Sequence, residues 1–215
     1  VATAVGCLSI ESPVRRLRGE TFDLSVMRDV SALARERGIG LHLDGARLFV
    51  AAAYSGRALI EYTSLFDTVY VSLWKCFNAA GGAVLAGSSA LLADLFHVRR
   101  MFGGALWNAW PYAAVAAHFA EGYLDRLTRA VGVSEELIAA LQAEPAFTVE
   151  RVPNGTSVFR LGLRRSDPVR FRERLAREGI ALPSPDGDGF WARVNETLLA
   201  RSAPDLAQAF RNALG

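Results

Sequence analysis

The sequence predicts an α/β fold with a largely parallel sheet, followed by a small α+β domain. Between residues 1 and 105, short apolar segments typical of strands alternate with longer amphipathic segments typical of helices. This order is typical of parallel sheets covered by helices. From residue 147 onward, the strand-like and helical segments are shorter and mixed. Of the 215 residues, 51% are hydrophobic and 21% charged, as expected of a folded protein with a core.

The first part of the chain contains four expected strands and several helices. Thr21 and Asp23 suit the N-terminus of the first helix, and Gly38 suits the position just after its end. Ser88 is expected to cap a later helix. The strands are expected at residues 1–10, 39–43, 68–73 and 82–86, and the remaining helices at 47–54, 88–101, 110–130 and 135–142, with a short helix or turn at 59–65.

The last part of the chain is expected to alternate between strands and helices over short distances. A turn with the sequence PNG, at residues 153–155, separates the first two of these strands. Strands are expected at residues 147–152, 156–161 and 190–194, with another near 181, and helices at 168–178 and 204–214. This mixture predicts a small α+β domain.

Composition excludes several classes of protein. The net charge is +2, and the densest basic cluster is Arg15, Arg16 and Arg18. We interpret this cluster as a solvated turn, because a nucleic-acid footprint needs a wider basic face. No apolar run reaches the length of about 18 residues that marks a membrane span. The sequence therefore predicts neither a nucleic-acid nor a membrane partner.

The cysteines indicate the cellular compartment to expect, and the first residues indicate whether the chain is a fragment. Cys7 and Cys76 lie far apart and form neither a disulfide framework nor a paired metal-ligand pattern. A reduced, cytoplasmic setting without a metal is expected. The chain opens on Val1 and an apolar segment, without a signal peptide. We expect an N-terminal part of the protein to be absent from this chain.

Asp44 directly follows the strand-like segment 39–43. Ligands of parallel sheets bind outside the carboxyl ends of the strands. A carboxylate at a buried strand end needs a partner. A protonated pyridine nitrogen suits it, because keeping that nitrogen protonated makes a pyridoxal ring an electron sink. Asp is also a good helix N-cap, and the two interpretations are compatible.

Lys75 follows the strand-like segment 68–73 and is the one lysine among 24 lysine and arginine residues. Arginine stays protonated near neutral pH and forms no Schiff base, whereas a desolvated lysine does. Because Asp44 and Lys75 both fall at predicted strand ends, we expect them at the same edge of the sheet. The alternative is a chance surface lysine in a chain rich in arginine.

Two further features lie close to these residues. Arg47 comes three residues after Asp44 and is placed to present a guanidinium to a substrate carboxylate or a cofactor phosphate. A surface ion pair is the alternative. Gly81 and Gly82 would let the backbone approach a cofactor closely, although a plain turn explains them equally well.

The segment HLDGARL at residues 42–48, followed by SLWK at 72–75, resembles the β-eliminating lyase/threonine aldolase family. RERG at 35–38 and MFGG at 101–104 support the resemblance, which covers nearly the whole chain but is weak beyond about residue 150. The resemblance implies the aspartate aminotransferase fold, known as fold type I of enzymes dependent on pyridoxal 5′-phosphate (PLP). Residues 1–130 would then be the carboxyl-terminal part of a large PLP-binding α/β domain, and residues 131–215 the small C-terminal α+β domain.

The resemblance also implies roles for individual residues. Lys75 would be the catalytic residue that carries PLP, and Asp44 would pair with the pyridine nitrogen. Arg47 would bind the cofactor and the carboxylate of an amino-acid substrate. A second carboxylate-binding arginine is expected in a late strand, where Arg193 is the best match and Arg201 the alternative. Family members are expected to act on amino acids as homodimers or homotetramers.

The departures from the family pattern are informative. KCFNAAGG at residues 75–82 stands where members often have KGLGAPVG, and GGALWN at 103–108 stands where they often have GGGMRQ. Trp107 thus occupies the position of a usual arginine, which leaves substrate and reaction type open. The part of the family that stacks on the cofactor ring and binds its phosphate would precede Val1, and His42, His97 and His118 are not substitutes.

The implied function is aldol cleavage of a β-hydroxy-α-amino acid to glycine and an aldehyde. The same groups can support β-elimination, racemisation or transamination, and a bulkier or aromatic substrate is one hypothesis that Trp107 suggests. A different class of function is a non-catalytic fragment that acts in association. A nucleotide-binding module is disfavoured, because the chain has neither a GxGxxG motif nor a P-loop.

Overall fold

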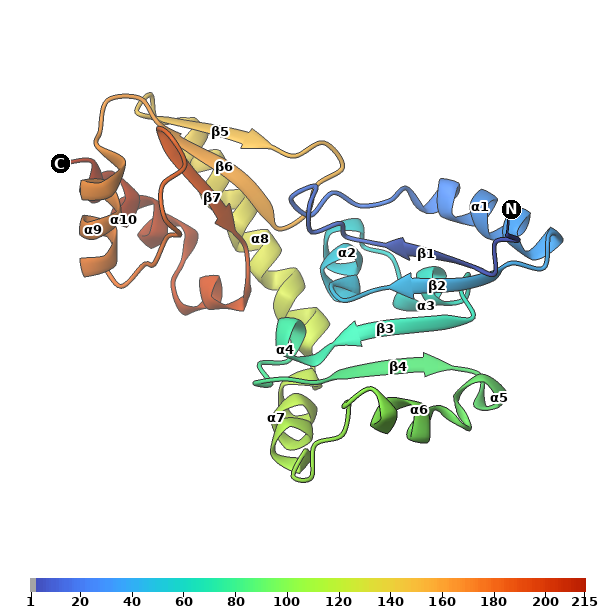
Figure 1. The fold of residues 1–215 in the computed structure, drawn as a ribbon. Helices are drawn as coiled ribbons and strands as arrows, with labels where there is room; N and C mark the ends of the chain where they lie inside the picture. The colour runs from blue at the N-terminus through green and yellow to red at the C-terminus, as the bar shows by residue number, and fades with distance from the viewer. Residues whose placement is uncertain (1–2) are drawn as a thin grey trace. The chain divides into compact units, whose positions relative to one another are not determined.

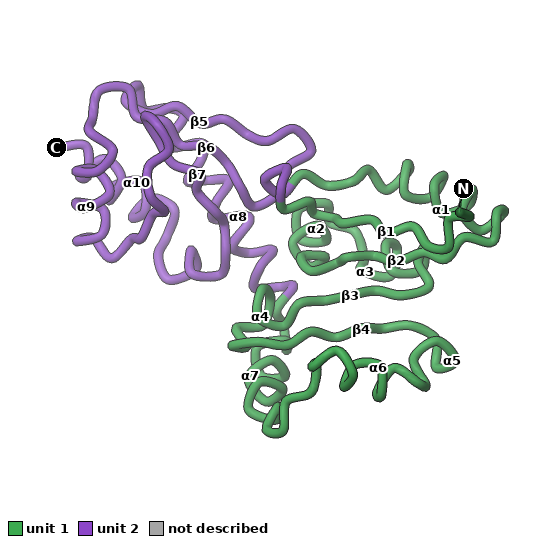
Figure 2. Tube along the Cα trace, viewed as in Figure 1, with its two compact units in different colours: residues 1–15, 20–123 green, residues 16–19, 124–215 purple. Residues whose placement is uncertain are grey.

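The structure, a computed structural model, describes residues 3–215 and divides into two compact units. The first unit comprises residues 1–15 and 20–123, and the second comprises residues 16–19 and 124–215 (Figure 2). The main boundary follows Tyr123, ahead of the boundary that the sequence predicts after residue 130.

The first unit contains a four-stranded sheet in the order β1-β2-β3-β4 (Figure 1). Strands β1, β2 and β3 are parallel, and β4 runs antiparallel to β3. The prediction of a mostly parallel sheet is therefore confirmed. The strands are β1 (Cys7–Glu11), β2 (Gly40–Asp44), β3 (Thr68–Ser72) and β4 (Ala83–Gly87).

Seven helices accompany this sheet among the described residues. Asp23 caps α1 by accepting hydrogen bonds from the backbone N–H groups of Ser25 and Val26, as the sequence predicts. Gly38 follows α1 with φ of 65°, the left-handed conformation expected of that position. The helices are α1 (Leu24–Glu36), α2 (Leu48–Ser55), α3 (Leu59–Thr63), α4 (Leu73–Cys76), α5 (Ser89–Leu92), α6 (Leu95–Met101) and α7 (Trp110–Ala120).

The two faces of the sheet in the first unit differ in burial. Leu41 and Leu43 of β2 point to one face and are at most 1% exposed. They pack with Met27 of α1 in a hydrophobic cluster. Because side chains alternate along a strand, His42 and Asp44 point to the opposite face, where both are only half-buried. The alternation thus places the candidate site on the face away from this cluster.

The second unit contains a three-stranded antiparallel sheet, in the order β5-β6-β7, with helices. Its core surrounds Phe171, which is fully buried and contacts the rings of Phe147, Phe190 and Phe210. The elements are α8 (Tyr123–Gln142), β5 (Phe147–Arg151), β6 (Val158–Leu163), α9 (Pro168–Arg177), β7 (Gly189–Arg193), the 3₁₀ helix η1 (Glu196–Ala200) and α10 (Ala203–Leu214).

Residues 16–19 belong to the second unit although they come early in the chain. The hydroxyl of Thr156 donates a hydrogen bond to the carbonyl oxygen of Gly19, at 2.8 Å. The guanidinium of Arg18 lies 3.7 Å from the centre of the Trp191 ring. The interpretation of the basic cluster as a solvated turn holds for Arg15 and Arg16, which are exposed, but it misses this stacking of Arg18.

The structure corrects the expected strand at residues 1–10 and the one near residue 181. Strand β1 begins at Cys7, because β2 offers no pairing partner before Gly40; residues 1 and 2 lie outside the described part. No strand forms near residue 181, where Pro183 and Pro185 lack the N–H group that a ladder requires.

Two expected helices also differ from those observed. The helix expected at 88–101 is divided into α5 and α6, although Ser88 caps α5 as predicted. The helix expected at 110–130 ends instead at Ala120, because Gly122 adopts φ of 62°. The chain then continues as one helix, α8, through the region expected to separate two helices. Within residues 3–215, no helix has the length and apolarity needed to cross a membrane.

Candidate active site

Asp44 is the last residue of β2 and lies at the carboxyl end of that strand. It is in register with Glu11 of β1 and Tyr70 of β3. Its Oδ1 accepts a hydrogen bond from the backbone N–H of Ala46 at 3.1 Å, so the carboxylate closes the turn that follows the strand. This bond occupies one carboxylate oxygen and leaves Oδ2 for a ligand. Asp44 thus closes a turn and is not the N-cap of α2, which is Arg47, so that interpretation is wrong, whereas the role of a ligand group is compatible with the geometry.

Lys75 lies in α4, the single turn of helix that follows β3. The sequence predicts it just past a strand end, and the structure places it three residues beyond Ser72, the last residue of β3. Its side chain is half-buried, and Nζ lies 5.2 Å from the centre of the neighbouring Trp74 ring. Because β2 and β3 are parallel neighbours, Asp44 and Lys75 follow strands that end at the same edge of the sheet.

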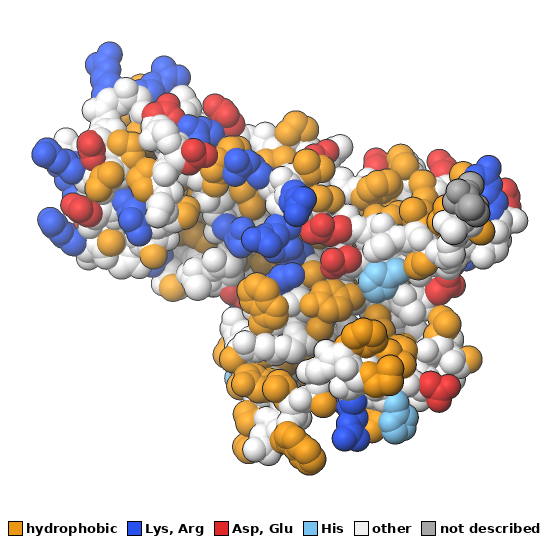
Figure 3. Space-filling view, viewed as in Figure 1, with side chains coloured by type: hydrophobic (Ala, Val, Ile, Leu, Met, Phe, Trp, Pro, Cys, Tyr) orange, Lys and Arg blue, Asp and Glu red, His pale blue; other side chains and the backbone are white. Residues whose placement is uncertain are grey.

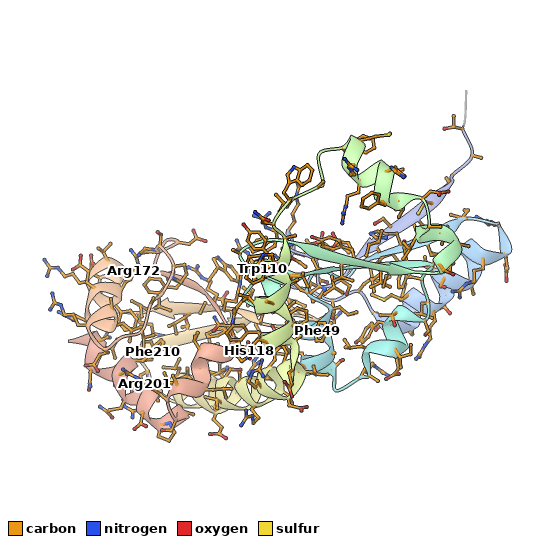
Figure 4. All side chains as sticks on the ribbon, turned by 90° about the horizontal axis from the view of Figure 1, so that it is seen from below. Phe49, Trp110, His118, Arg172, Arg201 and Phe210 are labelled. Atoms are coloured by element: carbon orange, nitrogen blue, oxygen red, sulfur yellow. The ribbon has the colours of Figure 1, made fainter. Side chains whose placement is uncertain are left out.

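Two contacts hold the segments that carry Asp44 and Lys75 against each other. The thiol of Cys76 donates a hydrogen bond to the carbonyl oxygen of Ala46, with a distance of 3.5 Å. The rings of Phe49 and Phe77 meet edge to face, with centroids 5.1 Å apart. Phe49 projects from α2 in Figure 4. The turn after β2 and the turn after β3 are thus packed together, as the candidate site requires.

Arg47 is the residue that precedes α2 and is half-buried. Its position, between Ala46 and Leu48, places it on the turn that Asp44 closes. The structure therefore brings Asp44, Arg47 and Lys75 to one edge of one sheet, as predicted.

Ser72, which opens the SLWK segment, is a buried polar residue at the candidate site. Its side chain is fully buried, and its Oγ has no hydrogen-bond partner within residues 3–215. Since residues two apart share a face, Ser72 points to the same face as Tyr70 and, by register, as Asp44. A buried hydroxyl without a partner lowers the stability of the folded protein by about 1–3 kcal/mol. A ligand that supplies the missing hydrogen bond would explain why a serine is placed there. The spacing of Ser72 and Lys75, three residues apart, is the sequence feature that could have indicated a role for Ser72.

Glu11 is a second neighbour that the sequence analysis does not single out. It ends β1 in direct register with Asp44, and its Oε1 accepts a hydrogen bond from the backbone N–H of Arg15 at 2.8 Å. Only the pairing of strands reveals that these two carboxylates are neighbours, because they lie 33 residues apart in the chain.

The candidate arginines of the C-terminal region belong to the second unit. Arg193 ends β7, and its side chain is exposed. Arg201, the alternative, donates a hydrogen bond from its guanidinium to the carbonyl oxygen of Glu178, at the end of α9 (Figure 4). This bond gives Arg201 a structural role within its own unit, so Arg193 stays the stronger candidate.

The positions of the three histidines and of Trp107 give no reason to add any of them to the candidate site. Nδ1 of His42 is 2.8 Å from Oγ1 of Thr68 on the next strand, so this ring is held within the sheet. His97 and His118 stack edge to face on Phe96 and Phe119 of their own helices. Trp107 lies in the loop before α7 and is 95% exposed. In residues 3–215, no cluster of His, Cys, Asp or Glu side chains has the composition of a metal site.

Comparison with known proteins identifies the family. The low-specificity L-threonine aldolase of Candida albicans is 32% identical over 159 residues, which make up 73% of this chain and 42% of that protein. The alanine racemase TOXG of Cochliobolus carbonum is 34% identical over 108 residues, or 50% of this chain and 28% of that protein. The chain thus spans less than half the length of these relatives.

A solved structure shows the same fold over nearly the whole chain. A protein from Exiguobacterium sp. 255-15, assigned as an aromatic amino acid beta-eliminating lyase/threonine aldolase, is 27% identical with a TM-score of 0.80. The match covers 96% of this chain and 62% of that one. The fold is that of the fold-type I PLP-dependent enzymes, which confirms the predicted fold class.

The beta-eliminating lyase family is PLP-dependent, and the model of this family matches residues 2–160. The match includes Asp44, Arg47, Ser72 and Lys75, the residues that the fold brings to one edge of the sheet. Because this match spans most of its length, the chain belongs to the beta-eliminating lyase family.

Proposed function

We propose that the protein is a PLP-dependent carbon–carbon lyase that cleaves a β-hydroxy-α-amino acid to glycine and an aldehyde. The observation that carries this proposal is the placement of Asp44 and Lys75 at the ends of adjacent parallel strands. Similarity to L-threonine aldolases supports the choice of reaction. The whole activity is a proposal, because the chain spans only part of the length of these relatives.

The residues present fit PLP. Lys75 offers the primary amine that binds the cofactor covalently, and Asp44 offers a carboxylate for a protonated ring nitrogen. The buried Oγ of Ser72, which has no partner in the described residues, offers a donor for a polar group of the cofactor. When bound, the cofactor supplies a conjugated ring that accepts the negative charge developing at the substrate α-carbon.

The protein residues would bind, orient and hold protons. Asp44 keeps the proton on the ring nitrogen by accepting its hydrogen bond. Arg47 grips the substrate carboxylate through two parallel N–H bonds, and Arg193 is proposed as the second arginine. Fixing the carboxylate would orient the substrate, so that the bond between its α- and β-carbons is held in the position from which it is cleaved.

A second reaction on the same groups is favoured by a specific observation. The match to an alanine racemase is as strong in identity as the match to the threonine aldolases, so racemisation is the main alternative. β-Elimination and transamination use the same binding groups, and the exposed Trp107 at a position usually held by arginine keeps all of them open. A non-catalytic fragment remains the alternative of a different class.

The proposal also covers the cellular location of the protein and its binding partners. Within the described residues, Cys7 and Cys76 form no disulfide bond, and a reducing cytoplasm is proposed as the location. The proposed partners are a small amino-acid substrate and further copies of the chain in a homodimer or homotetramer. Neither nucleic acid nor a membrane is proposed as a partner.

The decisive experiment uses the fact that Lys75 is the one lysine in the chain. Purified protein is mixed with PLP, reduced with borohydride and digested, and the modified peptide is found by mass spectrometry. We expect the label on Lys75, and we expect Lys75→Ala to lose both the label and the visible absorbance of the bound cofactor. Identical spectra for wild type and Lys75→Ala would overturn the proposal.

A product assay then separates the reactions. With threonine as substrate, aldol cleavage releases glycine and acetaldehyde, whereas racemisation of alanine changes only optical activity. Labelling of Lys75 without glycine formation, but with inversion of alanine, would replace the aldolase by the racemase.

A further inference from the structure

Residues 16–19, which we call the strap, are the part of the loop between β1 and α1 that belongs to the second unit (Figure 2). The backbone N–H of Val14 donates to the carbonyl oxygen of Glu20 at 2.8 Å, so the strap is the closed tip of this loop. Arg18 and Gly19 have φ of 56° and 84°. The left-handed conformation is strained for arginine and persists only where surrounding contacts hold it.

The strap makes such contacts with the sheet of the second unit. The guanidinium of Arg18 lies 3.7 Å from the centre of the Trp191 ring, and the hydroxyl of Thr156 donates to the carbonyl oxygen of Gly19. A Cβ on Gly19 would lie 2.9 Å from that hydroxyl oxygen and 3.8 Å from Cγ2 of Val158. The strap therefore packs on Val158 of β6 and Trp191 of β7.

Both of these residues are direct neighbours of Arg193. Val158 is in register with Arg193 on the adjacent strand. The backbone N–H of Val194 donates to the carbonyl oxygen of Ser157, so Val158 and Arg193 form a non-hydrogen-bonded pair, in which side chains lie closer together. Trp191 is two positions before Arg193 and points to the same face of β7. The strap thus contacts two residues that flank Arg193 on this face.

The Trp191 ring is held by three groups, whereas Arg193 has no such anchor. The Nε1 of Trp191 donates to Oδ2 of Asp186 at 2.9 Å, and the guanidinium of Arg160 lies 5.8 Å from the ring centre, opposite the contact with Arg18 in the sequence of strands. The exposed guanidinium of Arg193 makes no hydrogen bond or ion pair with residues 3–215. Its position therefore depends on the packing of its neighbours.

Basic side chains gather near the middle of the view in Figure 3, where Figure 1 places β6, β7 and the loop after β1. An anion that approaches this face of the sheet would meet guanidinium groups.

We propose that Arg18 and Trp191 are positioning residues for Arg193, and that the strap fixes the direction in which Arg193 presents its guanidinium to a substrate carboxylate. This role rests on the proposed function, in which Arg193 binds that carboxylate. Arg18 restricts the Trp191 ring, and this ring together with Val158 restricts the rotamers of Arg193. A side chain that is ordered in advance loses less entropy on binding, so the strap should raise the affinity for substrate and leave the chemical step unchanged.

The first measurement needs no cofactor. Trypsin cleaves after arginine, and the strap contains the exposed Arg16 as well as the stacked Arg18. We expect cleavage after Arg18 to be slower than cleavage after Arg16. Trp191→Leu should speed cleavage after Arg18 by about 2- to 5-fold, the change expected when a cation–π contact is lost, and leave cleavage after Arg16 unchanged. Equal rates after Arg18 in wild type and Trp191→Leu would overturn the proposal.

The second measurement is the affinity of the chain loaded with PLP for L-threonine, read from the visible absorbance of the cofactor. Arg18→Ala should weaken binding by about 2- to 5-fold and leave kcat for glycine formation unchanged. Arg18→Lys keeps a cation for the ring and should restore most of the affinity. The matched control is Arg16→Ala, which removes an exposed arginine of the same strap and should leave the affinity unchanged.

A double-mutant cycle shows whether Arg18 acts through Arg193. Arg193→Ala should weaken threonine binding by about 10- to 100-fold, and adding Arg18→Ala should cause no further loss, because the positioned group is gone. Additive losses would mean that Arg18 acts by another route, and the proposal would be wrong.

The single variants separate this role from the proposed function. Wild-type affinity in Arg18→Ala, together with a loss in Arg193→Ala, would overturn the positioning role alone. Wild-type affinity in Arg193→Ala, or no uptake of PLP at Lys75, would refute both the proposed function of that residue and the role of the strap.

Discussion

At the scale of single residues, the candidate site consists of groups whose partners are incomplete. Asp44 uses one carboxylate oxygen in a local turn, and Ser72 uses its buried hydroxyl in no hydrogen bond that the described residues provide. A buried hydroxyl such as that of Ser72 destabilises the protein unless a ligand supplies its hydrogen-bond partner. Substitution of Ser72 is therefore expected to have opposite effects on the stability of the free protein and on the binding of the cofactor.

Ser72→Ala should stabilise the free protein and weaken its binding of PLP. Removal of a buried hydroxyl without a partner recovers its desolvation cost, about 1–3 kcal/mol of unfolding free energy. Chemical denaturation with and without PLP measures both effects. Destabilisation of the cofactor-free protein by Ser72→Ala would indicate a partner for Ser72 within the chain. The control is Ser134→Ala, which should destabilise the protein, because it removes a buried hydroxyl that donates a hydrogen bond to the carbonyl oxygen of Val131.

Asp44→Asn should preserve cofactor attachment at Lys75 and lower the turnover of the proposed reaction. A carboxylate beside a protonated nitrogen favours protonation by about 1–3 pKa units, so we expect a loss of about 10- to 1000-fold. Steady-state kinetics with borohydride labelling at Lys75 separates loss of turnover from loss of cofactor. Full activity in Asp44→Asn would contradict the proposed role toward the cofactor and leave Asp44 only its hydrogen bond with the backbone N–H of Ala46.

At the scale of elements, α1 depends on its cap. Hydrogen bonds from the side chain and backbone of Ser25, followed by one from the backbone of Val26, lower the pKa of the exposed Asp23 below its ordinary value of 3.8. A group whose pKa is lower in the folded state stabilises the fold above its unfolded pKa, and this contribution is lost as the pH falls through the folded value.

Asp23→Ala should therefore lower the melting temperature at neutral pH, and Asp23→Asn should lower it less, because Asn also caps well. The difference between wild type and Asp23→Asn should shrink as the pH falls below the ordinary pKa of 3.8, and it should vanish below the lowered pKa of the folded protein, where Asp23 is protonated. Thermal melts between pH 3 and pH 7 measure this, and a difference that persists unchanged in acid would refute the electrostatic part of the cap.

The break between α7 and α8 makes a second prediction at this scale. Gly122 holds φ of 62°, whereas Gly132 lies inside α8 with open space where a Cβ would be. We expect Gly122→Ala to destabilise the protein by about 1–2 kcal/mol, because the left-handed conformation is strained for alanine. Gly132→Ala should stabilise it by about 0.5–1 kcal/mol, because glycine is a poor residue inside a helix. Opposite signs in urea denaturation would confirm the assignment.

At the scale of the whole molecule, residues 3–215 form a hydrophobic core in each of the two units. One surrounds Leu43 in the first unit, and the other surrounds Phe171 in the second, and both side chains are fully buried. Each core is therefore expected to stabilise its own unit.

Phe171→Ala should cost the second unit about 3–5 kcal/mol, and Leu43→Ala should cost the first unit about 2–5 kcal/mol. Hydrogen exchange with peptide resolution is the measurement, since each variant should raise exchange within its own unit. Equal acceleration in both units by either variant would show that the two cores unfold together.

Local patterns in the sequence determined most elements and the main site residues. The strand-like segments before Asp44 and Lys75 predicted their shared edge, and the cap at Asp23 and the glycine at 38 predicted the limits of α1. These predictions succeed because periodicity and capping depend on residues a few positions apart. The family resemblance supplied the cofactor and the expected roles of Arg47 and Arg193.

Only the tertiary structure decided what lies next to what across the chain. It placed Glu11 beside Asp44, left the hydroxyl of Ser72 without a partner in the described residues, and joined residues 16–19 to the second unit. It also showed that β4 is exposed and lies at the edge of the sheet, antiparallel to β3. Strand register and burial depend on contacts between residues far apart in the chain, so they are absent from local patterns and appear only when the chain is folded.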